Sequence, residues 1–398
     1  MVLLYFISFL LIWQFVGYPI LMALVAIKSK PKNKDYSYQP FVSILVPTYN
    51  ESQVIRKRIE NLIDLNYPKD KYEIIVVDSG STDDTSKIVK EFSERNKNPL
   101  VKFVEEGERR GKASAINFGK RFAKGEIILV TDANSIFDKN VLREIMPHFK
   151  DPKVGAVGGR FIVMNPDDSL ASSTQFYWDL EYIMRRGERV VDSACLFHGE
   201  INAWRKDIVD ADTGMLSEDL DMAIQIRKKG YRIEYEPKAV VYEPAPTTVE
   251  DQIRQRKRTS IGTIQNLFKH WKYFLLPRDW YSFLIFPSHK TLTMFSPFLL
   301  IATPLIYLLV WDIKVILLHL LLTILVFSIL LYVTLYLRGR LLEAGNPVKR
   351  ENHGISFLSL FKIAYYVLLN EYLILLAWKD FILRRYSVLW EKAKTTRT

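Results

Sequence analysis

The stretch IILVTDANSIF, residues 127–137, decides the fold class. Its first four residues are apolar and have the length of a fully buried strand. The polar run Thr131 to Ser135 then interrupts it. Asp, Asn and Ser are common turn and helix-cap residues, and Ser135 is placed to cap a following helix. The alternative is a metal and diphosphate site at the carboxyl end of a sheet strand. The sequence on either side favours the second interpretation.

Short apolar runs alternate with helical patterns from about residue 40 to residue 280. The runs FVSILVP (41–47) and YEIIVVD (72–78) predict strands, whereas ESQVIRKRIENLIDL (51–65) and GKASAINFGKRFA (111–123) predict helices. STDDTSKIVKEFSER (81–95) predicts a helix opened by a capping box of Ser81 and Asp84. Strands and helices that alternate in this way predict an α/β fold with a mostly parallel, doubly wound sheet.

Polar groups follow three of the predicted strands. The segment PTYNE follows the first strand, Asp78 ends the second and Asp132 ends the third. Ligands of doubly wound sheets bind beyond the carboxyl ends of the strands. Three polar strand ends at one edge therefore indicate a binding site rather than three unrelated turns.

The composition indicates a soluble part joined to a membrane part. Of the 398 residues, 49% are hydrophobic and 25% are charged, and the net charge is +11. A basic excess suits nucleic acid, anionic lipid or a phosphorylated substrate. We expect no nucleic-acid partner, because the basic residues gather near the membrane ends and in one short run, and no nucleic-acid module is recognised. The single cysteine, Cys195, cannot form an intramolecular disulfide, which fits a reducing cytoplasmic face.

Apolar stretches near both ends of the chain predict membrane segments. Residues 1–27 read as an N-terminal transmembrane anchor, and the four lysines that follow predict a cytoplasmic domain at residues 40–280. The C-terminal membrane region, residues 281–398, contains two predicted spans at 291–310 and 315–337. A third apolar stretch, 355–378, carries Lys362, Asn370 and Glu371, so it either spans the membrane or lies in its interface. These features predict a multi-pass protein of the cell membrane with its soluble domain in the cytoplasm.

Several common sites are absent from the sequence. No G-x-x-x-x-G-K-[ST] pattern and no G-x-G-x-x-G fingerprint occurs, and the cysteine and histidines lack zinc-ligand spacing. A nucleotide would therefore be held by strand-end side chains and a metal.

Seven motifs in order carry a resemblance to a known family: VPTYNE, VVDSGSTDDT, RRGKASAIN, VTDANS, FHGEINAWRK, LSEDLDMA and QRKRTS. The chain resembles the membrane-bound, inverting family-2 glycosyltransferases of the cellulose, chitin and hyaluronan synthase type. The resemblance implies a GT-A fold at the cytoplasmic membrane face, a nucleoside-diphosphate sugar donor (a UDP-sugar), Mg²⁺ or Mn²⁺ as cofactor, and a saccharide or lipid-linked acceptor among membrane lipid. Two alternatives stay open within it: a processive polysaccharide synthase, and an enzyme that glycosylates a polyprenyl phosphate or another lipid once.

The same resemblance assigns roles to individual residues. Asp219 is the expected general base, because Ser217-Glu218-Asp219 matches the Thr-Glu-Asp motif of the family. Asp132 and Asn134 are the expected metal ligands. Donor binding is expected from Thr48, Tyr49, Glu51, Asp78, Lys112, Asp132, Gln255 and Arg258, and acceptor contacts from Glu218, His198, Gly199 and Trp204.

Two positions depart from the family pattern. The Asp-x-Asp motif is here Asp132-Ala133-Asn134, so Asn134 offers a carbonyl oxygen without charge. The Trp of Gln-x-x-Arg-Trp is here Thr259, which removes an aromatic platform for an acceptor sugar. We therefore expect weaker metal binding and either short products or a lipid acceptor.

Overall fold

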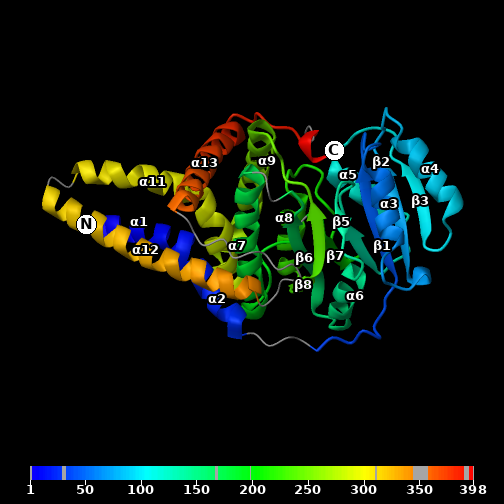
Figure 1. Ribbon diagram of the computed structural model, residues 1–398, viewed down its shortest axis with the longest axis horizontal. Coiled ribbons are helices and arrows are strands. Elements are labelled where there is room, and N and C mark those ends of the chain that lie inside the picture. The colour runs from blue at the N-terminus through cyan, green and yellow to red at the C-terminus, as the bar shows by residue number, and fades with distance from the viewer. Residues whose placement is uncertain are drawn as a thin grey trace.

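The protein has an α/β body joined to a bundle of long helices (Figure 1). The computed structural model describes residues 2–28, 33–165, 169–197, 199–309, 312–343, 357–389 and 394–397. The α/β body lies at the right of Figure 1 and the long helices extend to the left.

One mixed sheet forms the centre of the body. Within the described residues it has eight strands in the order β3-β2-β1-β4-β7-β6-β8-β5. The strands β3, β2, β1 and β4 are mutually parallel, β6 is parallel to β8, and β7 and β5 run antiparallel to their neighbours. The bounds are β1 Val42–Thr48, β2 Tyr72–Asp78, β3 Leu100–Glu105, β4 Ile127–Val130, β5 Ile136–Phe137, β6 Val154–Val163, β7 Asn202–Arg205 and β8 Arg232–Glu243.

Helices cover both faces of the sheet because successive side chains of a strand point to opposite faces. On β1, Ile44 packs in the core beneath α3, whereas the next residue, Leu45, packs in the core beneath α5 and α8. The helices of the body are α3 Ile55–Ile63, α4 Thr85–Arg95, α5 Lys112–Lys120, α6 Val141–Ile145, α7 Ser169–Val191, α8 Glu218–Lys228 and α9 Val249–Lys269. The predicted α/β class is confirmed, and the antiparallel strands make the sheet the mixed type of a GT-A fold.

Two local predictions were wrong. The helix after β2 begins at Thr85, and the Ser81 hydroxyl donates to Asp78 Oδ1 (2.5 Å) instead of forming a capping box. No helix follows Ser135 directly: the short strand β5 begins at Ile136, and the Ser135 hydroxyl donates to Glu243 Oε2 (2.7 Å). In both cases a tertiary partner competes for a hydroxyl that the local sequence offers to a helix end.

Three helical runs among the described residues are long and apolar enough to cross a membrane: Val2–Lys28, Tyr281–Leu309 and Ile313–Leu337. The first comprises α1 Val2–Ile12, the π-helical turn η1 Trp13–Gly17 and α2 Tyr18–Lys28. The second comprises η4 Tyr281–Ile285, η5 Pro287–Thr291 and α11 Leu292–Leu309, and the third lies in α12 Ile313–Glu343. The second run begins at Tyr281, earlier than the predicted residue 291. α2 packs closely on α7, where a Cβ on Gly187 would lie 2.3 Å from the Met22 carbonyl oxygen.

The ambiguous stretch 355–378 falls largely in α13 Phe357–Ile382, which is not one of these three runs. α13 is held along α9, since the Arg256 guanidinium donates to Asn370 (2.7 Å) and Lys257 pairs with Asp380. The chain beyond it returns to the α/β body, where Arg397 contacts Glu51. These contacts place α13 along α9 and the C-terminal tail against the α/β body.

Candidate active site

A cleft opens at the carboxyl ends of β1 and β4. Thr48, Tyr49, Glu51, Lys112 and Asp132 line it together, as the strand-end argument predicts. A larger cavity, of about 480 Å³, lies at the opposite edge of the sheet around Tyr67 and contains none of the predicted site residues. The candidate site is therefore the smaller cleft, because chemically relevant groups meet there.

Lys112 connects this cleft to the start of α8. Its Nζ lies 2.5 Å from Asp132 Oδ1, 3.2 Å from the carbonyl oxygen of Gly199 and 3.9 Å from Glu218 Oε1. Burial alone would lower the pKa of Lys112, but the nearby carboxylates outweigh it and hold that pKa above its ordinary value. A charged ammonium group therefore sits between the strand-end acid and the start of α8.

Three carboxylates converge beside Lys112. One oxygen each from Asp132, Glu200 and Glu243 lie within 4.8 Å of one another. Burial and the neighbouring acids raise the pKa of Glu200 to about 8, and the same causes raise the pKa of Glu243. The Asn134 amide N–H donates to the Glu243 carboxylate, whereas the side-chain oxygen of Asn134 is buried without a hydrogen-bond donor. Carboxylate and amide oxygens are the ligands that hard divalent cations prefer, so these residues fit Mg²⁺ or Mn²⁺.

Sequence reasoning missed Glu200 and Glu243. Glu200 lies inside the motif FHGEINAWRK, and Glu243 ends β8. Glu243 carried the same signal as Asp78 and Asp132, an acid at the end of a strand. What the local pattern did not show is that β8 lies beside β6 and β5, which brings its end to Asn134 and Ser135.

The expected base lies in the first turn of α8, as predicted. Ser217 occupies the N-cap position, and Glu218 and Asp219 begin the helix. Burial raises the pKa of Asp219, while the positive charges of Lys112 and Arg258 oppose that rise. The Arg258 guanidinium on α9 donates to the carbonyl oxygen of Leu216 (3.2 Å), so it lies against the same turn.

α9 rests directly on the turn that carries Asp219. A Cβ on Gly262 would lie 2.2 Å from Ser217 Oγ and 2.7 Å from Ser217 N, so only glycine permits this approach. The Asn266 amide also donates to the carbonyl oxygen of Ser217 (3.3 Å). Arg258 and Gly262 are one helical turn apart, and this close contact therefore fixes Arg258 relative to Asp219.

Other predicted residues lie elsewhere. Asp78 is fully buried and accepts hydrogen bonds from Ser81 and Ser86, so it shapes the loop that borders the cleft instead of lining it. Trp204 is 1% exposed in the core on β7, where its indole has no surface for an acceptor sugar. Gln255 is exposed on α9. His198 lies outside the described residues.

The C-terminal tail closes over the donor end of the cleft, which the sequence did not indicate. The Arg397 guanidinium contacts both oxygens of Glu51 at 3.3 and 3.5 Å, and Val388 and Arg397 both line the cleft. The carbonyl oxygen of Thr396 accepts from the Asn134 amide (3.4 Å), and the Thr395 hydroxyl donates to Asp251 (3.0 Å). The tail therefore contacts both predicted donor and metal residues.

The mixed sheet and its strand-end acids define the GT-A class of glycosyltransferases. Residues 43–211 match the family model described as Glycosyl transferase family 2. The chain is 31% identical over 315 residues to the "Probable glycosyltransferase YdaM" of Bacillus subtilis (strain 168), covering 73% of this chain and 74% of that one. The chain belongs to glycosyl transferase family 2, which confirms the predicted resemblance.

Two further similarities bear on function. The chain is 32% identical over 227 residues to the poly-beta-1,6-N-acetyl-D-glucosamine synthase of Staphylococcus aureus (strain COL), covering 56% of this chain and 54% of that one. It thus spans about half the length of that curated relative. The solved structure of mannosyltransferase PcManGT from Pyrobaculum calidifontis, in complex with GDP-Man and Mn²⁺, has a TM-score of 0.68 and 25% identity and covers 96% of this chain and all of that chain.

Proposed function

We propose that the protein transfers a sugar, with inversion, from a nucleoside-diphosphate sugar to a saccharide or lipid-linked acceptor at the cytoplasmic face of the cell membrane. The observation that carries this proposal is Lys112, which contacts Asp132 at the donor end and lies 3.9 Å from Glu218 beside the expected base. One cation between a diphosphate-type site and a base is the arrangement that direct displacement needs.

The chemistry follows from the charges of the cleft. The acceptor hydroxyl passes its proton to the Asp219 carboxylate, and its oxygen attacks the anomeric carbon of the donor sugar from the side opposite the diphosphate. The bond between the anomeric carbon and the diphosphate oxygen breaks, and the diphosphate leaves with the electron pair. Lys112 and Arg258 stabilise the negative charge that develops on it. Thr48, Tyr49 and Glu51 hold the nucleoside.

Asp132, Glu200, Glu243 and the amide oxygen of Asn134 would hold Mg²⁺ or Mn²⁺, which when bound neutralises charge on the diphosphate. The expectation of weak metal binding rested on Asn134 alone. The two added glutamates supply the charge that Asn134 lacks, so we propose an ordinary divalent-metal requirement. The Mn²⁺ in the complex of PcManGT supports this part of the proposal.

The number of sugars added to the acceptor distinguishes two candidate functions. The similarity to a poly-beta-1,6-N-acetyl-D-glucosamine synthase favours a UDP-sugar donor and polysaccharide synthesis. Single addition to a lipid is favoured by Thr259, which is exposed on α9 and presents no aromatic surface. The cytoplasmic location is supported by the lysines that follow the first apolar run, through the positive-inside tendency.

The test is an assay of purified membranes that contain the full chain, with UDP-N-acetylglucosamine, UDP-glucose and GDP-mannose offered in turn. We expect turnover of one donor, loss of that turnover in Asp219→Asn, and a product whose mass spectrum shows the number of sugars added. Turnover that survives in Asp219→Asn would exclude Asp219 as the base. Consumption of none of the donors would contradict the proposed substrate class.

A further inference from the structure

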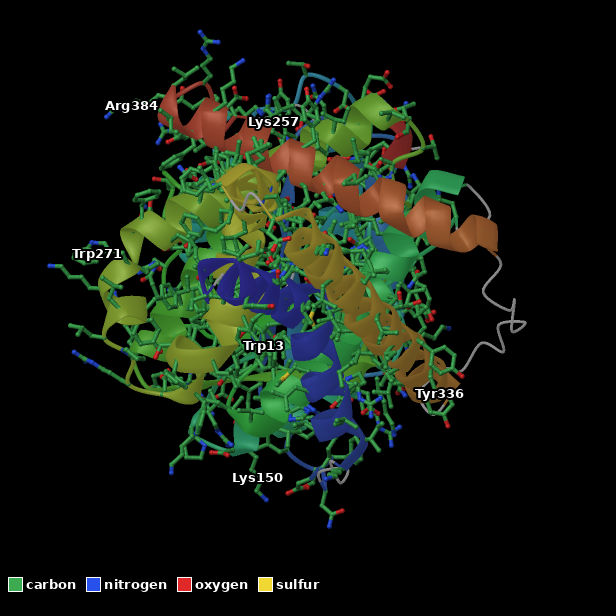
Figure 2. The ribbon with its side chains drawn as sticks, turned by 90° about the vertical axis from the view of Figure 1, so that its left-hand side faces the viewer. Trp13, Lys150, Lys257, Trp271, Tyr336 and Arg384 are labelled. Atoms are coloured by element: carbon green, nitrogen blue, oxygen red, sulfur yellow. The ribbon has the colours of Figure 1, made fainter. Side chains whose placement is uncertain are left out.

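An exposed apolar surface lies at the start of the second membrane run and extends before it. It is formed by residues 271–283, hereafter the 271–283 segment, which includes the short helix α10 Trp271–Leu275 and the start of η4. Five of its side chains are more than half exposed: Trp271, Leu275, Leu276, Trp280 and Phe283. Figure 2, viewed toward the end of the helix bundle, shows Trp271 projecting outward at the edge of the molecule. Apolar side chains concentrated in one exposed segment mark an interaction surface.

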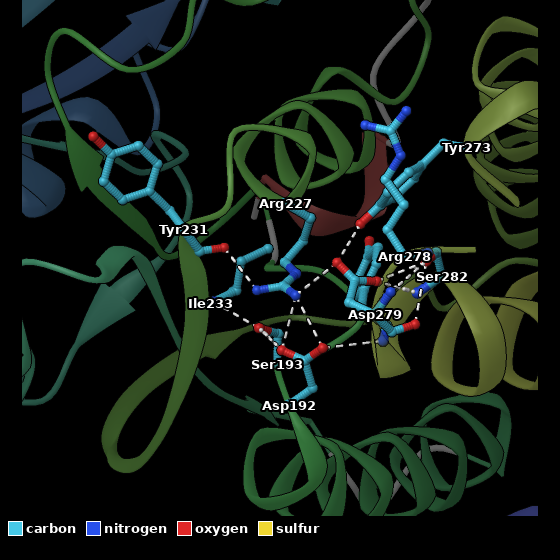
Figure 3. Close-up of polar contacts among 10 residues, drawn as sticks. Asp192, Ser193, Arg227, Tyr231, Ile233, Tyr273, Arg278, Asp279 and Ser282 are labelled. Atoms are coloured by element: carbon cyan, nitrogen blue, oxygen red, sulfur yellow. Dashed lines mark hydrogen bonds and ion pairs between the residues drawn. The ribbon is translucent and has the colours of Figure 1, made fainter. Parts of the chain in front are cut away.

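The other side of this segment is polar and is bound to the α/β body by ion pairs and hydrogen bonds. Figure 3 shows Arg227, at the last turn of α8, between Asp192 and Asp279. Its guanidinium lies 2.9 Å from a carboxylate oxygen of each, and it also donates to the carbonyl oxygen of Tyr231 (2.8 Å). Asp279 in turn accepts from the Tyr273 hydroxyl (2.8 Å). A buried cation shared by two carboxylates is costly to disrupt, so this contact holds the segment in one orientation.

The same helix connects this segment to the expected base. α8 carries Asp219 in its first turn and Arg227 in its last, and it is eleven residues long. A helix of that length behaves as a short rigid rod. The surface that binds the 271–283 segment therefore also determines how far Asp219 lies from that surface.

Cations accompany the apolar side chains. Lys272 and Arg278 are exposed, and the Lys272 ammonium lies 5.6 Å from the centroid of the Trp271 ring. In Figure 3 the Arg278 guanidinium extends away from the Arg227 contacts. By contrast, Arg256 and Lys257 of α9, which belong to the basic run of the sequence, bind Asn370 and Asp380 of α13. Lys272 and Arg278 are thus better placed than that run to meet an anionic surface.

We propose that the 271–283 segment lies in the membrane surface, with its aromatic and aliphatic side chains at headgroup level and Lys272 and Arg278 on anionic phospholipid. The segment is continuous with the membrane run that begins at Tyr281, so its chain enters the bilayer at this point. Tryptophan and tyrosine are enriched at this depth, and basic residues there bind anionic headgroups. The contact sets the height of Asp219 above the bilayer, whichever sugar the enzyme transfers.

The experiment uses the full chain in lipid nanodiscs. Leu276→Cys is labelled with an environment-sensitive fluorophore, and Phe122→Cys, on the α/β body and 44% exposed, serves as the matched control. The native Cys195 is fully buried and contributes little background. We expect blue-shifted emission and at least a several-fold lower quenching constant for iodide at Leu276 than at Phe122. Equal quenching at the two positions would overturn the proposal.

A second arm tests the chemistry of the lipid. The Leu276 probe is compared in phosphatidylcholine discs with and without phosphatidylglycerol, in the native background, in Lys272→Glu and in the control Lys87→Glu, whose side chain is exposed on α4. We expect the anionic lipid to deepen the blue shift in the native background and in Lys87→Glu, and Lys272→Glu to lose that gain. The same response in all three backgrounds would overturn the anionic preference. Both arms are independent of donor turnover.

Discussion

Replacement of Gly262 by alanine should slow transfer without unfolding the protein. The added Cβ would lie 2.7 Å from the backbone nitrogen of Ser217, whereas ordinary contacts begin at 3.4 Å, so α9 must retreat by about 0.7 Å. The Ser217 hydroxyl, at 2.2 Å, can rotate away, but the backbone nitrogen cannot. Arg258 moves with α9. Because a misplacement of about 1 Å can cost ~100-fold in rate, we expect kcat to fall by roughly 10- to 100-fold.

The stability of this variant should change little. Alanine has a helix propensity about 1 kcal/mol better than glycine, which offsets part of the ~1–3 kcal/mol cost of overpacking. The assay measures kcat and donor KM in nanodiscs together with the melting temperature. Gly339→Ala in α12 is the matched control, because a Cβ there meets no atom within 4 Å. The reasoning is refuted if Gly262→Ala keeps the native kcat while remaining folded, or if Gly339→Ala loses as much.

Three other substitutions test the remaining parts of the site. Asp219→Asn should bind the donor normally and lose ~10²–10⁴ in transfer rate. Because burial raises the pKa of Asp219 above the ordinary value of 3.8, the rate of the native enzyme should decline on acidification at a higher pH than it would with an exposed aspartate as base. A native rate that stays constant across that pH range would argue against a base at this position. Glu243→Gln removes a carboxylate whose oxygen lies within 4.8 Å of those of Asp132 and Glu200. Because hard divalent cations bind carboxylates more strongly than neutral amides, Mn²⁺ should bind at least roughly 10-fold more weakly by electron paramagnetic resonance titration, and unchanged binding would remove Glu243 from the ligand set. Arg397→Ala should open the donor end of the cleft to water, raising the ratio of free sugar to transferred sugar, and an unchanged ratio would show that the tail does not exclude water.

The local pattern of the sequence determined the elements and the edge of the sheet at which the site lies. Alternating apolar runs predicted β1, β2 and β4, and β2 Tyr72–Asp78 has the predicted bounds. These predictions succeeded because strand and helix periods are properties of neighbouring residues. Parallel strands end at one edge, so Thr48 and Asp132 could be placed together without knowledge of the remaining strands.

Tertiary structure alone decided which distant residues complete the site. Glu243 reaches Ser135 only because β8 pairs with β6 and β5, and Arg397 reaches Glu51 only because the tail after α13 returns to the α/β body. It also buried Trp204 in the core. Strand order, helix packing and the path of the tail depend on burial and pairing between segments far apart in the chain, and a local pattern contains no information about its partner. The sequence therefore determined where the site begins, and the packing of remote segments determined which charges surround it.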